Sequence, residues 1–412
     1  MPDSTTVDLS TTVGGILLPT CIYNASGPRS GTVEALKKVA QSPGTGAVLS
    51  KSATIESQTG NPMPRVHHDE DALASYNSEG LPNQGIDYYV QQENVQEIMS
   101  STSNKPYMAS LSGKTLEDNI VMMKRVLVDL SPQARAQISA IELNLACPNI
   151  VGKPTLAYDM EQLEMVLQRV TTEFGKYYNK QRQPPVFGVK LPPYLDMIQL
   201  QQVADILNQY RCGGGSKKGF LSYITTMNTM GNALPIDVSV QQPFISANSG
   251  LAGMSGRAVH ATACANVWKF RSCLDPSIDI VGVGGVETGE DVIRLVLCGA
   301  KAVQVGTTHW KEGTGCFERI AKEVQVWLEQ HGHDSIGKVY NQLQPWSKER
   351  AGEARLIKKQ KAANTKKSST AESSAEVQSN DASFWKLVSA ILLVIVAVLC
   401  ADKWHGNLLP SE

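Results

Sequence analysis

The chain has 412 residues and a nearly balanced charge, with 38 lysine and arginine residues against 39 aspartate and glutamate residues. This balance excludes the strongly basic surface with which many proteins bind nucleic acid. The 8 cysteines have no CxxC pairs or metal-ligand spacing, and no apolar signal segment stands at the N-terminus. We therefore expect free thiols, a reducing compartment and no metal site.

From about Thr12 to Gln330, short β-like runs alternate with amphipathic stretches of helical periodicity. The runs expected to be strands are Cys21–Asn24, Ala47–Ser50, Tyr107–Leu111, Ala140–Leu145, Val186–Leu191, Leu221–Thr225, Ile278–Val283 and Ala302–Val305. The stretches expected to be helices include Leu116–Leu130, Met160–Tyr178, Met197–Tyr210, Gly289–Leu297 and Cys316–Glu329. Eight such alternations favour an α/β fold of the (β/α)8 type, a TIM barrel, over an open sheet. The segment before Pro19 is expected to form a hairpin that closes the bottom of the barrel.

Polar and glycine residues recur where the predicted strands end. The carboxyl ends of barrel strands face the reaction site. The candidates at these ends are Asn24–Gly27, Lys51, Asn144–Asn149, Lys190, Asn228 with Thr229, Gly284 with Gly285, and Gly306 with Thr307. The adjacent His67 and His68 fall outside the predicted strands, and we interpret them as part of a surface loop. Recurrence over several strands is stronger evidence for a site than any one motif.

The strand predicted at Ala140–Leu145 leads into a cysteine flanked by two asparagines. Asn144 and Asn149 can each donate and accept hydrogen bonds, which suits a planar ligand with amide and carbonyl groups. Cys147 would then be the group that exchanges a proton with this ligand. The alternative is a buried structural thiol, because free cysteines are often buried.

Glycine-rich turns follow the last two predicted strands. Gly284 and Gly285 precede a predicted helix, and Gly306 and Thr307 follow one βα unit later. Backbone N–H groups in such turns, together with an electropositive helix N-terminus, bind phosphate. The first turn fails as a dinucleotide fingerprint, because Glu287 stands where the third glycine should be. A tight turn without a ligand is the alternative.

Two lysines end predicted strands at equivalent positions, Lys51 and Lys190. A lysine is costly inside a barrel mouth unless it meets an anion or an electron-rich ring, although a surface position is possible for either one. A flavin with its phosphate would give both a partner, since the ring gains negative charge on reduction.

The loop expected at Tyr76–Asn83 supplies the carboxamides of Asn77 and Asn83. The backbone N–H groups of Glu79, Gly80 and Leu81 in the same loop suit a carboxylate. Asn228 and Thr229 add a further amide and hydroxyl. Together these groups predict a small, planar, polar substrate, with structural turn asparagines as the alternative.

The composition changes after about Pro345. Residues 346–383, first basic and then rich in Ser, Glu and Ala, predict a flexible linker. The apolar run at 384–401, with Trp385 and Trp404 at its ends, predicts a membrane-spanning tail anchor followed by a short tail at 402–412. The barrel would occupy 1–345 on the cytosolic side of an intracellular membrane. A helix that docks on the barrel or on a partner is the alternative.

The sequence resembles the dihydroorotate dehydrogenases, and within them the fumarate-linked class. The matching blocks lie in order between about residues 10 and 345: Asn24–Gly27, Lys51–Thr54, Gly60–Arg65, Asn77–Asn83, Glu142–Asn149 with Gly152–Pro154, Gly188–Pro193, Asn228–Asn232 and Gly284–Gly289. This resemblance implies a homodimeric FMN enzyme of pyrimidine synthesis, which oxidises dihydroorotate to orotate and reduces fumarate to succinate at one site.

The resemblance also implies roles for individual residues. Cys147 is the implied general base that takes the C5 proton of dihydroorotate, while hydride passes from C6 to flavin N5. Lys51 is implied to touch both flavin and substrate, Lys190 to lie beside the flavin ring, and Arg65 to stand on a mobile loop. The implied substrate contacts are Asn77, Glu79, Gly80, Leu81, Asn144, Asn149, Asn228 and Thr229. The implied flavin and phosphate contacts are Ala25, Ser26, Asn144, Gly253, Gly284, Gly285, Gly306 and Thr307.

Four features depart from the family pattern. Thr229 replaces a common serine, Ala146 replaces a serine beside the base, Leu251–Gly256 is less glycine-rich than usual, and Gly213–Lys218 resembles a loop insertion. A quinone-linked enzyme is an alternative, although that class has serine in place of Cys147. An NAD-linked enzyme would need an iron–sulfur partner chain. Outside the family, a phosphate-binding barrel lyase would not explain the paired lysines, and a non-catalytic membrane-tethered scaffold would not need an intact site.

Overall fold

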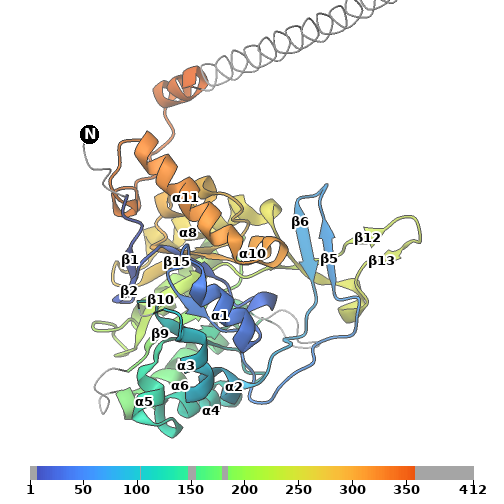
Figure 1. Cartoon of the computed structure of the whole chain (residues 1–412), viewed down its shortest axis with the longest axis vertical. Helices are drawn as coiled ribbons and strands as arrows, with labels where there is room; N and C mark the ends of the chain where they lie inside the picture. The colour runs from blue at the N-terminus through green and yellow to red at the C-terminus, as the bar shows by residue number, and fades with distance from the viewer. Residues whose placement is uncertain (1–6, 103, 147–154, 179–183, 358–412) are drawn as a thin grey trace, which may run out of the picture. The chain divides into compact units, whose positions relative to one another are not determined.

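The computed structural model describes residues 7–102, 104–146, 155–178 and 184–357 (Figure 1). The chain divides after Leu343 into two compact units. In the second unit, residues 348–357 are helical. The first unit is built on an eight-stranded sheet whose neighbouring strands all pair in parallel.

The order of this sheet is β3-β16-β15-β10-β9-β8-β7-β4. Its strands are β3 (Ile22–Asn24), β4 (Val48–Leu49), β7 (Tyr107–Leu111), β8 (Ile138–Asn144), β9 (Val186–Lys190), β10 (Leu221–Thr226), β15 (Asp279–Val283) and β16 (Ala302–Val305). All eight predicted strands are therefore confirmed, with bounds that agree within two residues. Strands buried on both faces have continuous runs of apolar residues, which makes them recognisable in the sequence.

The two outer strands of the sheet, β3 and β4, are joined by the side chain of Asn24. Its Nδ2 donates to the carbonyl of Leu49 (2.7 Å), and its Oδ1 accepts from the Leu49 amide (3.0 Å). The carboxamide thus replaces a pair of backbone hydrogen bonds and brings the sheet to a near-closed barrel. Asn24, expected to face the reaction site, is fully buried in this seam.

A hairpin of β1 (Thr11–Val13) and β2 (Ile16–Leu18) closes the amino end of the barrel, as predicted. Val13 and Leu18 are fully buried against the residues that fill the barrel interior, Tyr23 and Tyr223 among them. Gly14 makes the turn with φ +56°, and a Cβ there would stand 2.5 Å from Cγ1 of Val186. The hairpin therefore fits tightly against the barrel strands.

The helices are α1 (Val33–Gln41), α2 (Ile86–Val90), α3 (Gln92–Met99), α4 (Leu116–Lys124), α5 (Pro132–Ala136), α6 (Met160–Tyr178), α7 (Met197–Gln209), α8 (His260–Cys273), α9 (Gly289–Leu297), α10 (Thr307–Glu312) and α11 (Gly315–Gln330). The predictions for α6 and α9 match at both ends. The single helix predicted at Leu116–Leu130 is instead α4 followed by a π-helical turn, η2 (Arg125–Asp129). The Gly213–Lys218 loop joins α7 to β10, so it lies at the amino end of the barrel, away from the carboxyl ends.

A second, antiparallel sheet was not predicted. It has the order β11-β14-β6-β5, with β5 (Val66–Asp69), β6 (Ala74–Asn77), β11 (Met230–Ala233) and β14 (Ala252–Ser255). A small hairpin, β12 (Ile236–Asp237) with β13 (Gln242–Pro243), projects beside it (Figure 1). The loop interpretation of His67 and His68 was wrong, because both lie in β5, where the His67 ring stacks on Phe244 with 3.8 Å between ring centroids.

In the parts of the chain that the structure describes, no helix has the length and apolar character needed to cross a bilayer. The predicted span at 384–401 lies outside the described residues, as does most of the predicted linker.

Candidate active site

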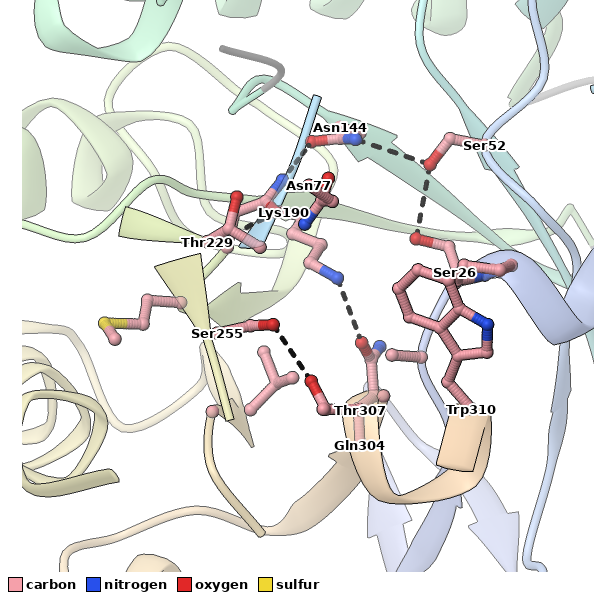
Figure 2. A pocket seen from close by; sticks show the side chains of 18 of the residues that line it. Ser26, Ser52, Asn77, Asn144, Lys190, Thr229, Ser255, Gln304, Thr307 and Trp310 are labelled. Atoms are coloured by element: carbon pink, nitrogen blue, oxygen red, sulfur yellow. Dashed lines mark hydrogen bonds between the residues drawn. The ribbon is translucent and has the colours of Figure 1, made fainter. Parts of the chain in front are cut away.

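A pocket opens where the barrel strands end, with an empty volume of about 1090 Å³ that is partly continuous with solvent (Figure 2). Loops after β3, β4, β10, β15 and β16 line it, together with the ends of β6, β8, β9 and β14. Predicted site residues on its wall are Ala25, Ser26, Lys51, Asn77, Glu79, Leu81, Asn144, Lys190, Asn228, Thr229, Gly284, Gly285, Gly306 and Thr307. The barrel thus brings together residues from its whole length.

Some predicted residues have other positions. Cys147 and Asn149 lie outside the described residues. Gly253 is on β14, where its carbonyl accepts from Asn77 (3.4 Å) and where a Cβ would stand 2.3 Å from the Thr229 hydroxyl. Gly253 therefore makes room for Thr229 and binds Asn77 through its carbonyl, but it does not line the pocket.

Two residues of the β6–α2 loop support the loop itself. Gly80 has φ +69°, and a Cβ there would meet Asn61 at 2.4 Å, so the turn requires glycine. Asn83 is buried, and its Oδ1 accepts from the amides of Thr54 (3.1 Å) and Gly85 (2.8 Å). Neither lines the pocket. Asn77, placed in a loop by the sequence analysis, is the last residue of β6.

The amide of Asn144 is held in one orientation. Its Oδ1 accepts from Asn228 Nδ2 (3.1 Å) and from the Ala146 amide (3.1 Å), and its Nδ2 donates to Ser52 Oγ (3.3 Å). Ser52 in turn donates to Ser26 (3.2 Å), as Figure 2 shows. The result is a polar wall whose donors and acceptors are already oriented for a ligand. Sequence reasoning missed Ser52, although it directly follows the predicted Lys51.

Lys190 enters the pocket from β9 and is 5% exposed. Its Nζ donates to Gln304 Oε1 on β16 (3.5 Å). Burial lowers the pKa of Lys190, the neighbouring charge of Lys51 lowers it further, and Glu142 opposes both effects. Glu142 and Gln304 were also missed, although each is a polar residue within an apolar barrel strand, which is a usable signal.

Lys51 has a different partner. Its Nζ lies 3.5 Å from Glu79 Oε2, and the other oxygen of this carboxylate lies 3.4 Å from Arg65 Nε. Arg65 also donates to the carbonyls of Thr59 (2.8 Å) and Asn61 (3.0 Å). The side chain of Glu79, and not only its backbone, therefore contributes to the electrostatics of the pocket.

The glycine turn after β15 presents its backbone to the pocket. Gly284 and Gly285 have φ +138° and +65°, and a Cβ on Gly285 would stand 2.7 Å from the carbonyl oxygen of Gly256. Both the left-handed backbone and the close approach require glycine here. Gly306, between β16 and α10, and Thr307, the first residue of α10, also line the pocket, with the Thr307 and Ser255 hydroxyls 3.0 Å apart.

The amides at the start of α9, the helix that follows the first glycine turn, already have acceptors within the protein. Asp291 Oδ2 accepts from the amides of Glu287 (3.1 Å) and Thr288 (3.0 Å), and Glu323 accepts from the Gly289 amide (2.7 Å). These carboxylates satisfy the amides at the start of α9 from within the protein.

The fold and the pocket define an α/β-barrel enzyme with two buried ammonium groups at the carboxyl ends of its strands. The chain belongs to the dihydroorotate dehydrogenase family, whose model matches residues 8–328. It is 39% identical over 342 residues to dihydroorotate dehydrogenase A (fumarate) of Lactococcus lactis subsp. cremoris strain MG1363, covering 81% of this chain and 99% of the relative.

Two further proteins are similar. A putative dihydroorotate dehydrogenase A (fumarate) of Streptococcus agalactiae serotype Ia is 36% identical, covering 82% of this chain and 99% of the relative. The crystal structure of DHODH from Eimeria tenella in complex with ferulenol matches with a TM-score of 0.64 at 20% sequence identity. That match covers 82% of this chain and 89% of the other, and it supports the fold alone.

Proposed function

We propose that this protein is a fumarate-linked dihydroorotate dehydrogenase of pyrimidine synthesis. It oxidises (S)-dihydroorotate to orotate and reduces fumarate to succinate in turn at one site. The observation that carries the proposal is one pocket that combines Lys51 and Lys190 with the oriented amides of Asn77, Asn144 and Asn228. The two bacterial relatives described above are named for the same reaction.

The pocket fits FMN as the cofactor. The pocket lies at the carboxyl ends of the barrel strands, and its wall combines glycine turns, hydroxyl groups, amides and two lysines. Glycines 284 and 285 allow the backbone to approach a phosphate, and Thr307 adds a hydroxyl donor. Ala25, Ser26 and Gly306 also line the pocket, and Lys190, at the end of β9, contributes a buried cation for the ring. When bound, FMN would accept a hydride from C6 of dihydroorotate and return it to fumarate.

The chain's own residues supply orientation and charge. Asn144 and Asn228 are fixed by their mutual hydrogen bond, so each offers its remaining hydrogen-bonding capacity to a planar ring in a set direction. Lys51 offers an ammonium to the substrate side, and the backbone at Glu79 and Leu81 lines the same side. These groups hold the substrate flat and exclude water from its reacting face.

Cys147 is the proposed base for the C5 proton. It follows Ala146, whose amide donates to Asn144 and whose carbonyl accepts from Asn228 (3.2 Å). The proposed base therefore directly follows a residue that is hydrogen-bonded to the two asparagines of the proposed substrate site. An ordinary cysteine has a pKa near about 8.5, so a proton relay or a local lowering is needed near neutral pH.

The spectrum of the purified protein tests the function. We expect a yellow protein that dihydroorotate bleaches and that fumarate restores faster than quinone or NAD does. A colourless protein, or restoration by quinone or NAD alone, contradicts the proposal. Parallel measurement of the three acceptors separates the fumarate-linked enzyme from the other two classes.

The Cys147→Ala variant tests the base. We expect it to retain FMN but to lose flavin reduction by dihydroorotate by about 10²–10⁴-fold at neutral pH, the usual contribution of a general base. Cys212→Ala, which changes a cysteine in the loop at the amino end of the barrel, is the matched control. Reduction of C147A at the wild-type rate would remove this assignment.

The apolar run at 384–401 is proposed as a membrane anchor, and a homodimer as the assembly. The support for the anchor is the sequence pattern of that run and its flanking tryptophans. Deletion of residues 370–412 should release an active enzyme into the soluble fraction. A truncated protein that remains on membranes would contradict the anchor. The mass of the truncated protein in solution tests the dimer.

A further inference from the structure

Below the pocket, Glu142 is fully buried inside the barrel. One oxygen, Oε2, accepts from Thr225 Oγ1 (2.7 Å) and from Gln304 Nε2 (2.9 Å). The other oxygen, Oε1, has no hydrogen-bond partner among the described residues. A carboxyl group buried in this way costs free energy unless another charge compensates it, so its retention calls for a physical reason.

Gln304 connects this carboxyl group to the pocket. Its Nε2 donates to Glu142, so its Oε1 is the atom that accepts from Lys190 Nζ. A flipped amide would turn its N–H groups toward the ammonium and its oxygen toward the carboxyl group, which would break both interactions. The three side chains therefore form an ordered row from the barrel interior to the pocket wall, and Figure 2 shows the hydrogen bond between Lys190 and Gln304.

We propose that Glu142 is a positioning residue that acts through Gln304 to keep the Lys190 ammonium charged and aimed at the FMN ring. This inference rests on the proposed function. The proposed role of the buried Glu142 carboxyl group is to influence the redox potential of the bound cofactor through Lys190, with Gln304 between them.

The groups around Lys190 make Glu142 the counter-charge. Lys51 on the loop after β4 lowers the pKa of Lys190, as burial does, and Glu142 on β8 raises it. Tyr223 on β10 and Tyr23 on β3 also face Glu142, but burial raises the pKa of both far above neutrality, so both stay uncharged. Without Glu142, both burial and the neighbouring lysine would therefore favour a neutral Lys190.

The midpoint potential of bound FMN, measured against pH, tests this. Electrons added to the ring favour the charged form of Lys190, so reduction takes up one extra proton in the pH window where that lysine titrates. The Glu142→Gln variant keeps the shape and the hydrogen-bond acceptor but loses the charge. We expect the window to move to lower pH by about one to three units. An unchanged window overturns the proposal.

Three further variants and one control test whether Glu142 acts through Gln304 and Lys190. Lys190→Met should abolish the window, and adding E142Q to it should change the pH dependence no further. Gln304→Met should move the window in the same direction as E142Q, and it provides the test should E142Q not fold. Glu173→Gln is the matched control, because Glu173 is 6% exposed and one of its oxygens also has no hydrogen-bond partner within the described parts of the chain, but it lies on α6 outside the barrel. A shift in E173Q equal to that in E142Q would contradict the assignment.

The same measurement distinguishes failure of the proposed function from failure of the proposed role of Glu142. If the wild-type protein binds no FMN, the proposed function fails. If it binds FMN that dihydroorotate reduces, but the window is the same in E142Q, only the role of Glu142 fails.

Discussion

The two lysines of the pocket occupy equivalent strand ends but different electrostatic surroundings. Lys190 lies 3.5 Å from an amide oxygen, that of Gln304, whereas Lys51 lies 3.5 Å from a carboxylate oxygen of Glu79. The carboxylate is shared with Arg65 at 3.4 Å. On the barrel side of the pocket, the amide of Gln304 separates the Lys190 cation from the carboxyl group of Glu142. On the loop side, the Lys51 cation contacts the Glu79 carboxylate directly. A ligand anion meets a fixed charge on one side and a competing anion on the other.

Loss of the barrel-side cation should have the largest effect. In Lys190→Met the charge that balances the reduced ring disappears, while the apolar stem is largely retained. We expect flavin reduction by dihydroorotate to slow by about 10²–10³-fold, as for removal of other preorganised electrostatic groups. Stopped-flow flavin absorbance under anaerobic conditions measures this rate.

Lys301→Met is the control for that variant. Lys301 precedes β16 at the amino end of the barrel, where its ammonium lies 4.1 Å from the centre of the Tyr340 ring. A K190M rate within threefold of wild type, or an equal loss in K301M, would show that the barrel-side lysine supplies no special charge.

Loss of the loop-side cation should have a smaller effect, because Glu79 already offsets part of its charge. For Lys51→Met we expect a decrease of roughly tenfold in kcat/KM for dihydroorotate, which corresponds to about 1.4 kcal/mol. Adding Glu79→Gln to this variant should recover part of the loss, since the remaining carboxylate repels the anionic substrate. A double variant no better than K51M would show that the carboxylate does not compete with substrate. Steady-state kinetics of the two variants and the wild type decide this.

The sequence predicted the positions of the two lysines better than it predicted the groups that contact them. The strand that precedes Lys51 and the strand that ends in Lys190 are recognisable because buried parallel strands are short apolar runs, and both β4 and β9 agree with their predicted bounds to within one residue. The groups that surround Lys190 could not be predicted in this way. Gln304 and Glu142 are 162 residues apart, and their contact exists only because the barrel closes.

The antiparallel sheet over the barrel escaped prediction for the same reason. In it, Asn77 pairs with Gly253, far along the chain, and β5 is a short strand of mostly polar residues. Its sequence, Val66–Asp69, therefore lacks the alternation of apolar and polar residues that identifies a half-buried strand. The local pattern of apolar residues thus predicts the strand end at which each lysine lies. The group that contacts each lysine depends on pairing between segments that are distant in the chain.

The smallest expected effect has the opposite sign. Glu79→Gln removes the carboxylate beside the loop-side lysine, so anionic ligands should bind more tightly by about two- to tenfold, which corresponds to about 0.4–1.4 kcal/mol. Fumarate carries two carboxylates and dihydroorotate one, so the KM for fumarate should fall more. Glu97→Gln, which removes an exposed partner of Lys37, is the surface control. Equal or weaker binding of both ligands in E79Q would mean that the Glu79 carboxylate serves only to hold Arg65 and its loop. In that case Glu79 would not reduce the charge that Lys51 offers to an anionic ligand.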